Sequence, residues 1–91
     1  MKFEWNLDKA RSNLTKHGVS FDEATTVFGD LLAVTYLDPE HSGDEIRYLT
    51  FGHSSQSRLI VVAHTDRDDK IRVISARAMT RKEKKDYEQI K

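Results

Sequence analysis

The sequence predicts an α+β domain in which a helix hairpin packs on a mainly antiparallel sheet. Three observations lead to this prediction. Apolar residues have helical spacing in the first third of the chain, alternate with a period of two through the middle, and give way to a capped helical segment at the end. The expected order is β-α-α-β-β-β-β-α in a single domain over residues 1–91, because a chain of 91 residues can bury one modest core.

A short strand and a helix open the predicted fold. Residues 3–5 alternate apolar and polar side chains, as an edge strand does. Asn6 or Asp8 can cap a helix whose apolar positions share one face: Leu7, Ala10 and Leu14. Gly18 ends this helix, because the residue just past a helix often needs the left-handed conformation that glycine tolerates.

A second helix should follow after a tight corner. Ser20 and Glu23 have the spacing of a capping box at its start. Its apolar face is the strongest helical stripe in the chain: Phe21, Ala24, Val27, Phe28 and Leu31. These side chains are expected to cover one face of the sheet.

Four strands and a final helix complete the prediction. The strands are expected at residues 31–37, 45–53, 58–66 and 70–78. Short polar turns separate them, so consecutive strands should pair antiparallel. The third of these strands is apolar on both faces and should be central in the sheet. Thr80 and Glu83 form a second capping box, which opens a helix over residues 80–91.

The zero net charge of the chain conceals two halves of opposite sign. Residues 1–52 hold five Lys/Arg against nine Asp/Glu, whereas residues 53–91 hold ten against six. This asymmetry indicates a nucleic acid or an acidic protein as a partner for the C-terminal side. The absence of cysteine excludes disulfides, and no apolar run has the length of a signal or membrane-spanning segment, so we expect a cytoplasmic protein without membrane contact.

Three segments carry a resemblance to a known family. They read FEWNLDKARSNLTKHGVSFDEATTVFGD, EIRYLTFG and RLIVVAHTDRDDKIRVISARAMTRKEKKDYE, and the KHGVSF and ISAR…E…Y pieces are specific at their spacing. Together they resemble the BrnT family of bacterial type II toxins. The resemblance implies a RelE-like fold, a ribonuclease activity that inhibits translation, and neutralisation by a BrnA-like antitoxin encoded beside the toxin. We expect a heteromeric complex with paired toxin subunits.

The implied reaction needs cations and a proton-transfer group, without a cofactor. A base takes the proton of the ribose 2′-OH, and cations stabilise the charge on the attacked phosphate. The candidate catalytic residues lie on three predicted strands: His64, Arg77, Arg47 and Arg72. Arg77 is expected to continue the apolar face of Ile71, Val73 and Ser75, where it could also simply emerge into solvent. Arg47 and Arg72 could equally pair with carboxylates, and His64 could be a surface or satisfied structural residue.

The predicted final helix supplies candidate RNA contacts. These residues are Arg81, Lys82, Lys85 and Tyr87. The cations could equally form a solvated helix face, and Tyr87 could dock the helix rather than stack on a base. No metal is expected, because the histidines lack the spacing of a zinc motif. A non-catalytic module that binds nucleic acid or an acidic protein through the same surface remains an alternative function.

Overall fold

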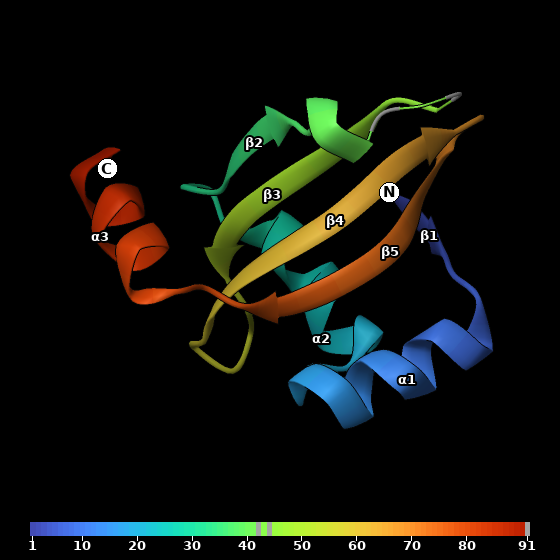
Figure 1. Cartoon of the computed structure of the whole chain (residues 1–91), viewed down its shortest axis with the longest axis horizontal. Helices are drawn as coiled ribbons and strands as arrows, with labels where there is room; N and C mark the ends of the chain where they lie inside the picture. The colour runs from blue at the N-terminus through green and yellow to red at the C-terminus, as the bar shows by residue number, and fades with distance from the viewer. Residues whose placement is uncertain (42, 44, 91) are drawn as a thin grey trace.

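The computed structural model describes residues 1–41, 43 and 45–90 of the chain. Two helices follow a short first strand, and four further strands precede a last helix (Figure 1). The elements are β1 (Lys2–Glu4), α1 (Leu7–His17), α2 (Phe21–Thr26), the 3₁₀ turn η1 (Val27–Gly29), β2 (Val34–Leu37), the 3₁₀ turn η2 (Pro39–His41), β3 (Arg47–His53), β4 (Leu59–Arg67), β5 (Lys70–Ala78) and α3 (Arg81–Ile90). The predicted α+β class and element order are confirmed.

The strands in the described residues form one sheet in the order β1-β5-β4-β3-β2. Strand β1 runs parallel to β5, and every other pair is antiparallel. The predicted central position of β4 is therefore confirmed. The helix hairpin of α1 and α2 lies on one side of the sheet, and the strands β3 and β4 pass in front of α2 in Figure 1. We call the opposite side, which faces the viewer, the open face.

The corner between α1 and α2 forms as the sequence predicts, but its buried face differs. Asn6 caps α1, and Gly18 adopts a left-handed φ of 70° just after it. Leu7 and Leu14 are exposed, however, and the buried residue of α1 is Asn13. Its side-chain amide donates to the Val19 and Ala76 carbonyls at 2.9 and 2.8 Å and accepts from the Ala76 amide at 3.1 Å. A polar side chain can hold this position because backbone groups satisfy it.

The second helix is shorter than its apolar stripe predicts. Phe21, Ala24 and Val27 are buried, whereas Leu31 is 98% exposed, so the prediction of a core role for Leu31 is wrong. Asp30 explains the difference, because its carboxylate accepts the Leu32 amide at 2.9 Å and its carbonyl accepts the Ala33 amide at 3.1 Å. The chain therefore turns at Asp30 instead of continuing as a helix.

A β-bulge in β5 changes which side chains reach the open face. His64 pairs with Val73 and Ala63 pairs with Ser75, so Ile74 is an extra residue on β5. Before the bulge, Val73 faces the helix hairpin, and after it Ala76 does. The prediction that Arg77 continues the face of Ile71 and Val73 is wrong, because the bulge moves Arg77 to the open face.

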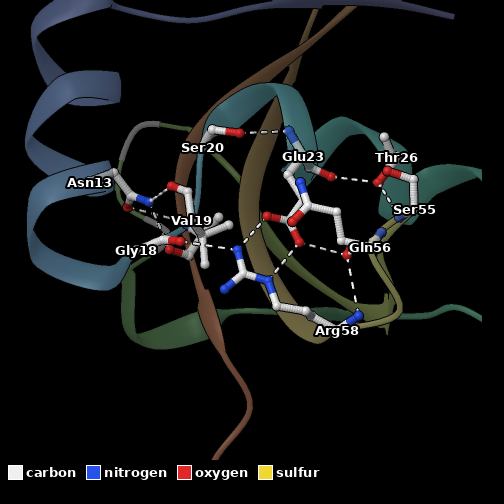
Figure 2. Close-up of polar contacts among 11 residues, drawn as sticks. Asn13, Gly18, Val19, Ser20, Glu23, Thr26, Ser55, Gln56 and Arg58 are labelled. Atoms are coloured by element: carbon white, nitrogen blue, oxygen red, sulfur yellow. Dashed lines mark hydrogen bonds and ion pairs between the residues drawn. The ribbon is translucent and has the colours of Figure 1, made fainter.

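The buried carboxylate of Glu23 connects the helix hairpin to the β3–β4 turn through hydrogen bonds (Figure 2). Glu23 is only 4% exposed and forms an ion pair with Arg58, whose Nε donates to it at 2.9 Å. Ser54 Oγ donates to the same carboxylate at 2.6 Å, and Arg58 Nη2 donates to the Gly18 carbonyl at 3.0 Å. Ser20 Oγ accepts the Glu23 amide at 3.0 Å, as predicted for the helix cap. The hydrogen bond from Arg58 holds the pKa of Glu23 below its usual range.

Candidate active site

The open face divides into a part covered by α3 and a part that is accessible. Tyr87 of α3 packs with Val61 and Met79 over one end of the sheet. Helix α3 lies at the end where β3 and β5 terminate, as Figure 1 shows. The remaining surface of the open face carries the polar side chains described next.

A cavity of about 370 Å³ lies on the accessible part of the open face. Strand residues form its floor, and η2 with the residue before it forms one wall. The lining residues are Asp38, Glu40, His41, Arg47, Leu49, Ala63, Ile74, Ser75 and Arg77. The cavity thus brings together two predicted site residues, Arg47 and Arg77.

Arg77 is held at the cavity by α3. Its Nη1 and Nη2 atoms donate to the two carboxylate oxygens of Glu83 at 2.7 and 3.0 Å. Glu83 also accepts the Thr80 amide at 2.8 Å, and Thr80 Oγ1 accepts the Glu83 amide at 3.1 Å, so the predicted capping box is confirmed. The hydrogen bonds from Arg77 lower the pKa of Glu83 to about 2, and the carboxylate in turn raises the pKa of Arg77.

The depressed pKa of Glu83 predicts a stability that depends on pH. A carboxylate with a lowered folded-state pKa stabilises the fold above its ordinary value of 4.5, and this contribution is lost as the pH falls toward about 2. We expect Glu83→Gln to lower the free energy of unfolding at pH 7, with the difference from the parent shrinking between pH 5 and pH 2. Urea unfolding across this range measures it, and a difference that stays constant with pH would contradict the assignment.

Arg72 lies on the open face in the same cross-strand row as Arg47. Both pair with Thr65 of β4, from opposite sides. Arg72 Nη1 donates to Glu4 of β1 at 3.1 Å, outside the residues that line the cavity. The pKa of Glu45 is lowered, first by its hydrogen bonds from Arg67 and further by the nearby charges of Arg47 and Arg72. The two guanidinium groups of this row therefore lie close to the carboxylates of Glu4 and Glu45.

His64 is not brought together with the arginines. It faces the helix hairpin, is 5% exposed, and packs edge-on against Phe28 with the ring centroids 4.9 Å apart. Its Nε2 shares a 2.7 Å hydrogen bond with Thr50 Oγ1, and Nδ1 has no partner among the described residues. Burial lowers the pKa of His64. The sheet therefore separates this imidazole from the cavity.

Another histidine lines the cavity. His41 ends η2, and its Nδ1 lies 3.0 Å from Asp38 Oδ2. Because a carboxylate accepts the Nδ1 proton, Nε2 is left as the basic atom of the ring. The sequence pattern did not predict His41 as a site residue. The signal that could have found it is the D-P-E-H segment, in which a 3₁₀ turn brings an aspartate against a histidine three residues later.

The predicted RNA contacts of α3 fall into two groups. Arg81, Lys82 and Lys85 are exposed, and Lys82 Nζ lies 3.1 Å from Asp86 Oδ2, one helical turn away. Tyr87 is buried instead, and its hydroxyl donates to Asp30 at 3.2 Å and to the Leu32 carbonyl at 3.3 Å. The structure thus uses Tyr87 to dock α3 onto the sheet and leaves its ring unavailable for stacking.

Neither a metal centre nor a membrane span is found in the described residues. Over residues 1–41, 43 and 45–90, no three His, Cys, Asp or Glu side chains are grouped closely enough to hold a metal ion. No helix in the same part of the chain is both long and apolar enough to cross a membrane.

The fold and the cavity define a class of protein: a small α+β domain with a polar pocket on a sheet face, lined by two arginines, two carboxylates and a histidine. A family model described as "Ribonuclease toxin, BrnT, of type II toxin-antitoxin system" matches residues 5–83. The structure is similar to the 1.1 Å crystal structure of the Brucella abortus ribonuclease toxin BrnT, with a TM-score of 0.70 and 23% identity over 89% of this chain and 99% of the other. No curated protein matches. The chain belongs to the BrnT family of ribonuclease toxins, which act in type II toxin-antitoxin systems with an antitoxin partner.

Proposed function

We propose that this toxin is a metal-independent endoribonuclease that cleaves RNA in the cavity of the open face and thereby inhibits translation in the cytoplasm. The observation that supports this most is the shared lining of the cavity by Arg47, Arg77 and His41, with Asp38 bound to the histidine. These side chains supply two guanidinium groups for a phosphate and one oriented imidazole for proton transfer.

In the proposed reaction, the phosphorus is transferred from the 5′-oxygen of one nucleotide to the 2′-oxygen of the preceding nucleotide. The 2′-oxygen attacks the adjacent phosphorus while the bond from phosphorus to the 5′-oxygen breaks, which leaves a 2′,3′-cyclic phosphate and a free 5′-hydroxyl. Arg47 and Arg77 hold the phosphate oxygens, where negative charge increases in the transition state. Fixed donors aimed at developing charge are a large contribution to catalysis.

His41 is the proposed general base in place of His64. Its neutral Nε2 accepts the proton of the 2′-OH, and Asp38 stabilises the imidazolium that results. Solvent water protonates the departing 5′-oxygen. His64 lies behind the sheet, so we propose that it supports the fold, and we place Arg72 as an electrostatic contact with RNA outside the cavity.

The exposed cations of α3 extend the proposed RNA surface. Arg81, Lys82 and Lys85 attract the phosphate backbone without sequence preference, because such contacts act through charge. The proposed antitoxin is a BrnA-like protein encoded beside the toxin, and the proposed complex contains paired toxin subunits.

Single-turnover cleavage of RNA in the presence of EDTA tests this function. We expect discrete cleavage to persist in EDTA, and His41→Ala to lower the rate about 10²-fold. His17→Ala is the matched control, because His17 lies on α1, away from the open face. Cleavage that EDTA abolishes would contradict the metal-free reaction, and full activity of His41→Ala would remove the histidine from it.

A further inference from the structure

The two edges of the sheet differ in how they are protected from pairing. Strand β1 spans three residues, and its Lys2 and Glu4 side chains form ion pairs with Asp69 and Arg72. Strand β2 carries no charged residue, and the exposed Leu31 and Leu32 precede it. Charged and short edges resist the addition of another strand, whereas an apolar uncharged edge is a template for it.

An apolar groove lies beside the β2 edge. The groove holds about 190 Å³ between β2, β3 and α3, and its lining residues are Tyr36, Phe51, Glu83, Asp86, Tyr87 and Ile90. Its lining includes three aromatic rings, and Ile90 in the same lining is half-exposed. The charged side chains in this lining are the carboxylates of Glu83, which is paired with Arg77, and of Asp86, which is paired with Lys82. We call this site the β2–α3 groove.

The acidic residues on either side of β2 favour a positively charged partner. No Lys or Arg occurs in residues 30–46, which contain β2 and its flanks, whereas five carboxylates do: Asp30, Asp38, Glu40, Asp44 and Glu45. A second copy paired antiparallel along β2 would bring the Asp30 end of one strand against the Asp38 and Glu40 end of the other. Like charges placed opposite each other oppose association, so a segment with cationic flanks fits better than a second copy.

We infer that the antitoxin binds here through an extended segment that adds a strand to β2, places apolar side chains in the β2–α3 groove, and carries Lys or Arg at its flanks. The inference rests on the proposed function for the identity of the partner. The ion pair of Arg77 with Glu83 lies between the groove and the cavity, since Glu83 lines one and Arg77 lines the other. A segment bound in the groove therefore lies directly beside the proposed active site.

A matched pair of substitutions tests the surface, with the protein encoded beside this toxin as the probe. Ile90→Lys places a charge in the β2–α3 groove and should weaken binding about 100-fold, because the apolar side chains proposed to pack there would meet a charged group. Leu14→Lys on α1 is the control, since Leu14 is 51% exposed and Ile90 is 53% exposed, and it should change the affinity less than about twofold. RNA cleavage by both variants should equal that of the parent, because neither residue lines the cavity.

Hydrogen exchange on the full chain gives a second, independent readout. The amides of β2 should gain protection in the complex, and the affinity should fall as the salt concentration rises. Equal affinity of the two variants, no binding of the probe, or protection confined to the open face would overturn the inference, while RNA cleavage would still test the proposed function separately. Size-exclusion evidence for a toxin dimer that Ile90→Lys dissociates would assign the groove to a second copy and would also overturn it.

Discussion

Replacing Arg77 with alanine should lower the single-turnover rate of RNA cleavage about 10²–10³-fold, because a donor aimed at the developing phosphate charge is lost. Arg77→Lys should keep most of this defect, since lysine retains the charge without the planar fork that binds two oxygens. Arg11→Ala on α1 removes the same side chain at a distance from the cavity and should leave the rate unchanged. Rates measured at saturating enzyme separate the chemical step from RNA binding.

The ion pair between Arg77 and Glu83 requires a further control. Alanine at position 77 also removes two hydrogen bonds that hold α3. Glu83→Gln removes the same ion pair but keeps the guanidinium, so its rate should be at least that of the parent. If Glu83→Gln loses as much activity as Arg77→Ala, then Arg77 acts through the position of α3 and does not contact the phosphate.

Much of the fold could be predicted because local signals and the sheet agree. Ser20, Gly18 and Thr80 set the helix ends through hydrogen bonds to nearby backbone groups or a left-handed φ, and such features depend on only a few neighbouring residues. The apolar character of β4 on both faces likewise requires a central strand. Local chemistry was sufficient at these positions.

The sequence-based predictions are wrong at positions where contacts between distant parts of the chain determine which side chains are buried. Ile74 becomes a bulge only because β4 and β5 pair in a particular register, and this single residue moves Arg77 to the open face. The alternation of β5 gives no sign of it. Asn13 is buried because Val19 and Ala76 offer backbone partners that lie far apart in sequence from one another.

The sequence predicts only part of the candidate site, because the positions of its side chains also depend on how the strands pair. The open face brings Arg47 and Arg77 to one cavity, as expected of strand residues near one another in the sheet. Residue type and strand position predict a site role for His64, but the alternation of β4 directs this side chain toward Phe28. His41 lies in a turn whose path over the sheet no sequence periodicity records.

Replacing Phe21 with alanine should cost about 3–5 kcal/mol in the free energy of unfolding, through lost burial and the cavity that remains. Phe21 is among the largest fully buried side chains and meets the Trp5 ring edge-on, with the centroids 5.9 Å apart. Small domains hold about 5–15 kcal/mol in total, so this variant should be close to unfolding at 37 °C. Urea unfolding monitored by Trp5 fluorescence measures the change.

Two further variants order the residues of the predicted apolar stripe by burial. Phe28 is half-buried against Phe3 and His64, so Phe28→Ala should cost less than Phe21→Ala. Leu31→Ala should change stability by less than about 0.5 kcal/mol, because an exposed side chain loses little burial on truncation. The helical periodicity alone predicts similar costs for all three positions. A large loss in Leu31→Ala would mean that the helix continues past Asp30, and it would restore the longer helix that the sequence pattern predicts.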